Sequence, residues 1–117
     1  MSDSIWGYQP TTGHIAGTDL TGWTVEATDG SVGKVDKHSD DVNSAYLVVD
    51  TGVWIFGKHV LLPAGTVKLV DLIEYKIYVD LTREQIKDSP EFDKDKHVGD
   101  AGYHEQLGSY YQNYRRA

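Results

Sequence analysis

The sequence contains no cysteine, which excludes disulfide frameworks, thiol nucleophiles, zinc ribbons and iron–sulfur clusters. It also lacks any apolar run near the roughly 18 to 20 residues that a membrane-spanning helix needs. Its longest such runs are 45–49 and 60–64. The start of the chain, residues 1–6, has neither the basic nor the apolar region of a secretory signal. We therefore expect a cytoplasmic protein with no transmembrane segment.

Basic side chains are scarce. Eleven Lys and Arg residues face 18 Asp and Glu residues, so the net charge is -7 and the isoelectric point is near 5.0. The electric field of such a chain repels polyphosphate backbones. We therefore expect no DNA binding, and we regard RNA as a disfavoured partner.

The length of 117 residues, with 39% apolar and 25% charged residues, fits one compact domain with tails. Residues 1–21 are poor in aliphatic side chains and predict an extended N-terminal arm outside the core. Residues 22–92 concentrate the aliphatics in short bursts separated by turn signals and predict the folded domain. Residues 93–117 predict an acidic and then tyrosine-rich C-terminal tail.

Two β-prone runs, 23–27 and 32–36, flank the Thr-Asp-Gly-Ser sequence at 28–31 and predict a hairpin. The Asp-Gly pair favours a two-residue turn in which both central residues have positive φ. Gly33, inside the second run, has no side chain to pack. This indicates a bulge, a sharp bend or a close backbone approach at a barrel corner.

Further strands are predicted by β-prone, apolar runs along the rest of the domain. The first of them is apolar on both faces, as in a strand buried between layers, and the last two form a second hairpin. Ile77, Val79 and Leu81 alternate along the last strand and share its inner face. The five runs are 45–49, 53–56, 58–63, 67–70 and 76–80.

Thr82 and Gln85 match the capping box, so a helix of one or two turns is predicted after Thr82, with its end at Ser89-Pro90. Together these elements predict an all-β fold. We expect a small, closed or nearly closed β-barrel of about six to seven short antiparallel strands, with a short C-terminal helix and extended tails.

The order of several short motifs resembles a known family. The sequence G-W-T-V-E-A-x-D-G-x-V-G-K-V over 22–35 is followed by Y-L-V-V-D at 46–50, L-L-P at 61–63 and V-D-x-T at 79–82. In this order the motifs resemble a PRC-barrel domain over about 20–92. The chain is similar to stand-alone bacterial members of the actinobacterial kind.

The resemblance implies a small β-barrel that docks onto a larger partner and associates as a dimer, without catalysis. Barrels of this family form the cytoplasmic part of the H subunit of photosynthetic reaction centres and part of a ribosomal small-subunit maturation factor. Stand-alone members are tied to cell division, sporulation or stress. The transmembrane helix of the H subunit and the extra N-terminal domain of the maturation factor have no counterpart in this sequence.

The sequence carries no set of residues typical of an enzyme, such as a nucleophile elbow, a His-Glu-x-x-His helix or a phosphate-binding Gly loop. Two acidic segments, Asp-x-His-x-Asp-Asp at 36–41 and Asp-x-Asp-x-His at 93–97, fail the calcium-loop pattern at its sixth and twelfth positions. His59, in an apolar strand, indicates a partly buried structural or pH-sensitive residue. We expect no catalytic residue, no metal site and no cofactor.

Aromatic side chains supply the candidate interface. Trp54 and Phe56 lie two residues apart on one face of a short strand, where a core role and an interface role are equally well supported. In the tail, an apolar helix face is predicted that packs on the chain's own barrel or on a partner, with a disordered tail as the alternative. That face consists of Tyr103, Leu107, Tyr110 and Tyr114.

These observations and the resemblance predict a non-catalytic PRC-barrel adaptor. We expect it to form a homodimer and to dock onto a larger, unidentified protein assembly through these aromatics. One alternative is an RNA or ribosome-assembly factor, by analogy with the maturation factor. Another is a peripheral membrane-associated subunit that resembles the cytoplasmic part of the H subunit.

Overall fold

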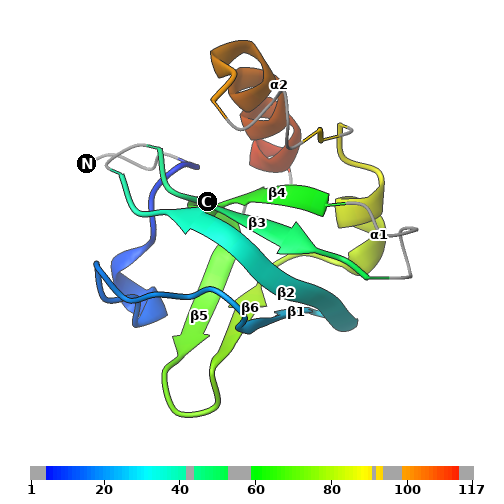
Figure 1. The fold of residues 1–117 in the computed structure, drawn as a ribbon. Coiled ribbons are helices and arrows are strands. Elements are labelled where there is room, and N and C mark those ends of the chain that lie inside the picture. The colour runs from blue at the N-terminus through cyan, green and yellow to red at the C-terminus, as the bar shows by residue number, and fades with distance from the viewer. Residues whose placement is uncertain (1–4, 42–43, 53–58, 91, 94–98, 114–117) are drawn as a thin grey trace.

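The chain folds around one curved six-stranded sheet, with helices at its rim (Figure 1). The computed structural model describes residues 5–41, 44–52, 59–90, 92–93 and 99–113. In these residues the strands are β1 (Thr24–Ala27), β2 (Gly30–Ser39), β3 (Tyr46–Asp50), β4 (His59–Pro63), β5 (Val67–Asp71) and β6 (Lys76–Val79). The helices are the 3-10 turns η1 (Pro10–Thr12) and η2 (Ala64–Thr66), and α1 (Arg83–Lys87) and α2 (Ala101–Gln112).

The sheet is mixed and open, whereas we expected antiparallel strands in a closed or nearly closed barrel. Its strand order is β4-β3-β2-β1-β6-β5, and β1 pairs with β6 in parallel. The β5–β6 hairpin fixes the direction of β6, which then lies beside the free edge of β1 with Val25 opposite Ile77. Both side chains are fully buried, so this pairing serves the core. Every predicted strand is confirmed with shifted ends, apart from 53–56, which lies outside the described residues.

Two irregularities bend β2. The register shifts between Val25 and Glu26 of the facing strand β1, and again between Val35 and Lys37 along β2 itself. Extra residues in one strand of an antiparallel pair kink it and increase its twist. The sheet therefore curves, and β5 and β6 run across the direction of β3 and β4 in Figure 1.

Gly33 lies at a close backbone approach, as predicted. A Cβ atom at this position would overlap the carbonyl oxygen of Asp50, and Gly33 has a φ of 155°. The first register shift lies at the same place, because Val25 pairs with Gly33 whereas Glu26 pairs with Ser31. Only glycine lets β2 pass the end of β3 this closely.

The turn between β1 and β2 differs from the prediction. Ala27 pairs with Gly30, so the two central residues are Thr28 and Asp29, and Asp29 does not have a positive φ. Positive φ falls on Gly30 instead, at 150°. The Asp29 carboxylate accepts a hydrogen bond from the Arg83 backbone N–H at 2.9 Å and thereby ties the turn to α1.

The N-terminal arm contributes to the core, contrary to our expectation. Ile5 and Leu20 are buried within the main apolar cluster, and Thr12 is buried as well. The backbone oxygen atoms of Ile5 and Trp6 accept hydrogen bonds from Gly65 N–H at 2.7 Å and Ala45 N–H at 2.9 Å. A curved sheet of this size leaves apolar edges uncovered, and the arm covers them. The domain boundaries at 21/22 and 92/93 remain predictions.

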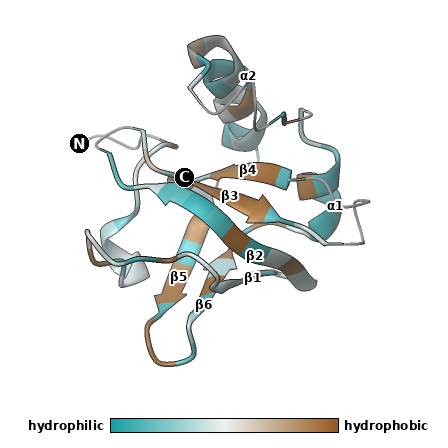
Figure 2. Ribbon diagram, in the orientation of Figure 1, coloured by the Kyte–Doolittle hydropathy of each residue, from teal (hydrophilic) through white to brown (hydrophobic). Residues whose placement is uncertain are grey.

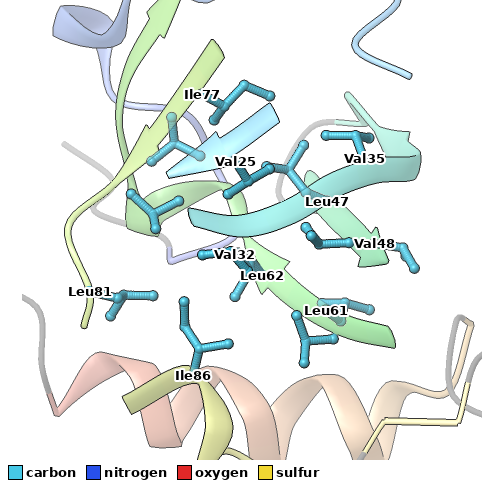
Figure 3. Close-up of a cluster of buried hydrophobic side chains, with 14 of the residues drawn as sticks. Val25, Val32, Val35, Leu47, Val48, Leu61, Leu62, Ile77, Leu81 and Ile86 are labelled. Atoms are coloured by element: carbon cyan, nitrogen blue, oxygen red, sulfur yellow. The ribbon is translucent and has the colours of Figure 1, made fainter. Parts of the chain in front are cut away.

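The core fills the concave side of the sheet and is closed by α1. Figure 3 shows side chains of the strands gathered together with Ile86 of α1. Ile86 is fully buried, because the capping box predicted at Thr82 and Gln85 is present and starts α1 with this face toward the sheet. The predicted inner face is confirmed, since Ile77 and Val79 of β6 and Leu81, just past its end, are all buried.

Helix α2 packs on the same body through part of the predicted face, and Tyr111 adds to that face. Its buried residues are Tyr103, Leu107, Gly108 and Tyr111, whereas Tyr110 is only partly buried. Tyr103, Leu107 and Tyr111 follow one another at intervals of four residues, which places all three side chains on one side of a helix. Asp100 starts the helix, because its carboxylate accepts from the Tyr103 backbone N–H at 3.1 Å.

Candidate functional site

A cluster of exposed apolar side chains marks the β5–β6 hairpin. Leu69, Leu72, Ile73 and Tyr75 are 43, 41, 85 and 62% exposed. With Ile15, at 57%, they make up the large apolar side chains that are exposed among the described residues. We call these four residues the hairpin patch, and Figure 2 shows hydrophobic colour on the loop that projects from the sheet. Such a concentration on one projecting loop is typical of a contact surface for another molecule.

The hairpin is held in place by its other face. Val70 and Ile77 pair across the two strands and are buried, so the alternate positions point outward. Asp71 pairs with Lys76 and closes the loop. The Asp71 carboxylate accepts hydrogen bonds from the backbone N–H groups of Ile73 and Glu74, both at 2.9 Å. The exposed side chains are therefore carried by a fixed turn.

Tyr75 has an unusual backbone conformation. Its φ of 58° is the one positive value among the described residues other than glycine. This conformation costs roughly 1 to 2 kcal/mol for a residue with a bulky side chain. The Thr24 backbone N–H donates to the Tyr75 backbone carbonyl oxygen at 3.3 Å. The Tyr75 ring packs edge-on against the Trp23 ring, with 5.3 Å between centroids. A large aromatic residue is thus kept exposed at a position that favours glycine or asparagine.

Charges of both signs surround the hairpin patch. Lys68 and Glu74 are exposed, while Asp71 and Lys76 are partly buried. An apolar centre with a mixed polar rim is the usual composition of a protein–protein contact. Such a balanced rim also gives no net attraction to a polyanion.

Of the six predicted interface residues, Trp54, Phe56 and Tyr114 lie outside the described residues. Tyr103 and Leu107 are buried against the chain's own sheet, and Tyr110 is partly buried there. The structure thus places Tyr103 and Leu107 in the core, and an interface role for the part of Tyr110 that remains exposed stays a prediction.

Hydrogen bonds from the α2 tyrosines hold the helix in place. The Tyr103 hydroxyl donates to the backbone carbonyl oxygen of Pro90 at 3.1 Å. The Tyr110 hydroxyl donates to the backbone carbonyl oxygen of Gln85 at 2.6 Å. Burial raises the pKa of Tyr103 well above its ordinary value, so it remains a neutral donor. The tyrosine-rich tail up to residue 113 is therefore part of the fold, and the disordered-tail alternative does not apply to it.

The acidic segments show no metal-binding arrangement where they are described. Among the described residues, no group of three His, Cys, Asp or Glu side chains is placed to hold a metal ion. His59 is partly buried, and its Nε2 lies 3.6 Å from an Asp36 carboxylate oxygen. His38 and Asp40 are close to one another, with 3.4 Å between Nδ1 and Oδ1. Asp95 and His97 of the second segment lie outside the described residues.

The sequence contained a signal for the hairpin patch that our interpretation missed. Leu72 and Ile73 occupy a loop between two strands, where polar residues with turn-forming chemistry are usual. Two adjacent aliphatic side chains in such a loop either fold back into the core or remain exposed on the surface, where another molecule can contact them. Only the structure shows that they project.

No protein-family model matches the chain, and no curated protein matches it. Among solved structures, the chain is similar to the crystal structure of RimM, a 16S ribosomal RNA processing protein from Pseudomonas aeruginosa. The two are 23% identical with a TM-score of 0.47, and the match covers 56% of this chain and 42% of that one. Among the described residues, no helix combines the length and the apolar character needed to cross a membrane.

Proposed function

We propose that this chain is a non-catalytic, PRC-barrel-like adaptor that binds a partner protein through the hairpin patch. The observation that carries this proposal is the exposure of Leu69, Leu72, Ile73 and Tyr75 on one ordered hairpin. Apolar side chains in water gain free energy when a partner covers them, at about 25 cal/mol for each Å² removed from water.

The fixed backbone of the hairpin supports the same proposal. A loop held by the Asp71 carboxylate loses little conformational entropy when it binds, because its conformation already exists in the free chain. Tyr75 adds a rigid aromatic ring, which is the kind of side chain enriched at the centre of protein contacts. Most of that ring is exposed to water and can be covered by a partner.

Affinity capture with single substitutions tests the docking surface. Ile73→Asp places a charge in the middle of the hairpin patch, and Ile15→Asp places the same charge at an exposed isoleucine outside the hairpin. We expect Ile73→Asp to weaken capture of the partner by at least about tenfold, which corresponds to roughly 1.4 kcal/mol. Ile15→Asp leaves capture unchanged. Retention of full capture by Ile73→Asp would contradict the proposal.

Light scattering over a range of concentrations separates the possible occupants of the patch. If a second copy covers it, the mass rises from 13.1 kDa toward twice that value, and Ile73→Asp keeps the chain monomeric. If a different protein covers it, both chains stay monomeric while only the wild type captures the partner. Saturable, salt-sensitive binding of ribosomal RNA that Ile73→Asp leaves intact would instead favour the RNA alternative.

A further inference from the structure

Strand β5 is one edge of the sheet, and the N-terminal arm covers its outward side. The strand order ends at β5, and the turn η1 of the arm packs beside it (Figure 1). A Cβ atom at Gly13, the residue that follows η1, would lie 3.4 Å from the Val70 backbone carbonyl oxygen. Val70 is 4% exposed, so the edge of β5 is buried beneath the arm at this point.

The backbone of Val70 points toward this cover. The Thr24 N–H donates to the Tyr75 carbonyl oxygen, so Tyr75 directs its backbone toward β1. Successive residues of a strand direct their N–H and C=O groups to opposite sides, and Ile77 therefore faces β1 as well. Val70 is paired opposite Ile77, which makes the two a pair without mutual hydrogen bonds. The N–H and C=O groups of Val70 consequently point away from β6, toward the free edge.

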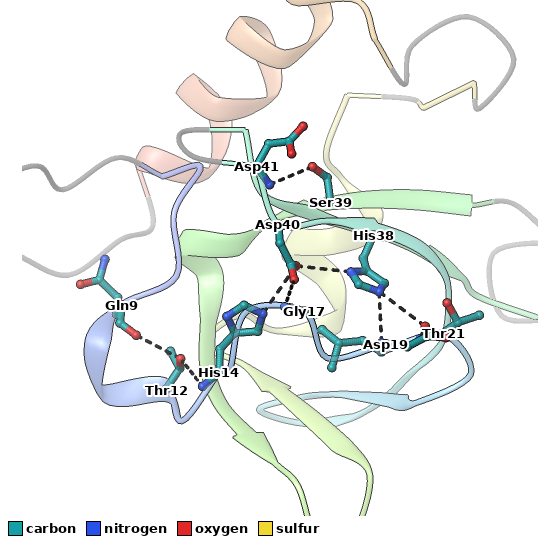
Figure 4. A network of polar contacts seen from close by, with 11 residues as sticks. Gln9, Thr12, His14, Gly17, Asp19, Thr21, His38, Ser39, Asp40 and Asp41 are labelled. Atoms are coloured by element: carbon teal, nitrogen blue, oxygen red, sulfur yellow. Dashed lines mark hydrogen bonds and ion pairs between the residues drawn. The ribbon is translucent and has the colours of Figure 1, made fainter.

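The arm satisfies its own hydrogen bonds here and leaves those of the edge unmade. Thr12 Oγ1 donates to the Gln9 carbonyl oxygen at 3.0 Å and accepts from the His14 N–H at 3.1 Å (Figure 4). The Thr12 N–H donates to the same Gln9 oxygen at 3.2 Å. Within the described part of the chain, no hydrogen bond joins η1 or Gly13 to β5. Because buried backbone groups without a partner are unfavourable, η1 covers this edge less well than a paired strand would.

We propose that η1 is an edge guard, which keeps the β5 strands of two copies of this chain apart, and that two copies pair through β5 when η1 is displaced. An uncovered edge strand is a template for a further strand. Such pairing supplies the hydrogen-bond partners that η1 does not give to Val70.

The charges along β5 favour a second copy as the occupant of this edge. Lys68 is exposed near the start of β5, and Asp71 is its last residue. In an antiparallel pair of identical strands the two ends are exchanged. Lys68 of each copy then lies toward Asp71 of the other, and opposite charges on neighbouring strands stabilise the pair.

Contacts on both sides of η1 keep the rest of the arm in place. Ile5, before η1, is buried in the core. After η1, His14 stacks on the Tyr8 ring with 3.7 Å between centroids, and its Nε2 lies 3.5 Å from an Asp40 carboxylate oxygen. The other Asp40 oxygen accepts from the Gly17 N–H at 3.1 Å. Displacement of η1 is therefore a local change that leaves the arm attached.

Gly13→Val in the full chain tests the edge guard. Gly13 has a φ of 84°, which valine rarely adopts, and the added side chain would press against the Val70 carbonyl oxygen. Gly17→Val is the matched control, because its φ of 90° is equally unfavourable while nothing lies within 4 Å of its Cβ position. Every chain in the test carries Ile73→Asp, which blocks association through the hairpin patch, so the outcome does not depend on that proposal.

Light scattering over a range of concentrations measures the mass of each chain. We expect the mass of Gly13→Val to rise from 13.1 kDa toward twice that value, while the parent chain and Gly17→Val stay monomeric. A monomeric Gly13→Val chain would overturn the proposal. Equal association of Gly17→Val would overturn it too, because loosening of the arm anywhere would then suffice.

Amide hydrogen exchange measured by NMR tests the same edge without displacing η1. In the parent chain we expect the Val70 amide to be at least about tenfold less protected than the Ile77 amide, because only Ile77 directs its N–H into the sheet. Equal protection of the two amides would show that Val70 already has a hydrogen-bond partner and would refute the proposal. In the associated Gly13→Val chain, protection of Val70 should rise by at least about tenfold. Association that leaves Val70 unprotected would place the contact elsewhere.

Discussion

Gly108 of α2 lies directly against the indole ring of Trp6 from the N-terminal arm. A Cβ atom at residue 108 would come within 2.9 Å of the Trp6 Nε1 atom and 3.3 Å of the Ile5 side chain. The indole in turn stacks on the ring of His104, with 4.9 Å between centroids. The arm and the last helix, from opposite ends of the chain, are thus packed together at a residue that has no side chain.

Gly108→Ala therefore destabilises the protein, although alanine is the better helix former. The displaced indole costs about 1 to 3 kcal/mol, which exceeds the helix-propensity gain of roughly 1 kcal/mol. Gly99→Ala, just before the same helix, is the control, because nothing lies within 4 Å of its Cβ position. Urea denaturation measures the free energy of unfolding of both variants. Equal stability of the two variants would show that the arm does not pack on α2 as described.

Gly33→Ala removes the close approach between β2 and the end of β3. The new methyl group would overlap the backbone of Asp50, which cannot move without breaking strand pairing, so we expect a loss of about 3 kcal/mol or failure to fold. Gly99→Ala is the control, since nothing lies within 4 Å of its Cβ position. The comparison uses urea midpoints, or soluble yield where the variant does not fold. A Gly33→Ala chain as stable as Gly99→Ala contradicts this packing.

Tyr75→Asn separates docking from stability. Asparagine tolerates positive φ, so the relief of backbone strain offsets the lost edge contact with Trp23, worth about 0.5 to 1.5 kcal/mol. We expect the free energy of unfolding to change by less than about 1 kcal/mol while partner capture weakens. Ile77, two residues along the chain, is fully buried. We expect Ile77→Ala to lower the free energy of unfolding by about 2 to 5 kcal/mol and to leave the hairpin patch itself unchanged. A large loss of stability in Tyr75→Asn would assign that residue to the fold.

His14 gives the protein a pH-dependent stability with a definite sign. Burial lowers the pKa of His14 below its ordinary value of 6.5, and this outweighs the opposing effect of Asp40. The unfolded chain therefore binds the proton first, and the free energy of unfolding decreases as the pH falls below about 6.5. His14→Phe keeps the stack on Tyr8 and cannot titrate. Urea midpoints at about pH 7.5 and about pH 5.5 should fall less in this variant than in the wild type. An equal fall in both would exclude His14 as a source of the dependence.

Local signals predict the elements well. The hairpins, the alternation along β6 and the capping box at Thr82 depend on residues within a few positions of each other, and they appear in the structure. The close approach at Gly33 also follows from the sequence, because a glycine within a strand often marks a place where another backbone comes near. The predicted turn at Asp29 is one residue out of place, since Gly30 supplies its positive φ as the first residue of β2.

The candidate sites are harder to predict than the strands. The Asp-x-His-x-Asp spacing draws attention to His38 and Asp40, but nothing near them in sequence indicates that His14 completes the group. Leu72 and Ile73 fit the core and a contact surface equally well until the direction of the hairpin is known. Tyr111 joins Tyr103 and Leu107 on the buried side of α2, and the packing of Gly108 against Trp6 could not be read from the helix spacing alone.

The sequence by itself determined the strand segments, the turns and the start of α1, because periodicity and turn chemistry act over a few residues. Only the tertiary structure decided that β6 pairs in parallel with β1, that Ile5 and Leu20 of the arm enter the core, and that Gly108 and Tyr111 are buried in α2. These outcomes depend on which apolar surfaces remain uncovered once the sheet curves. That is a property of residues far apart in the chain, and no local pattern encodes it.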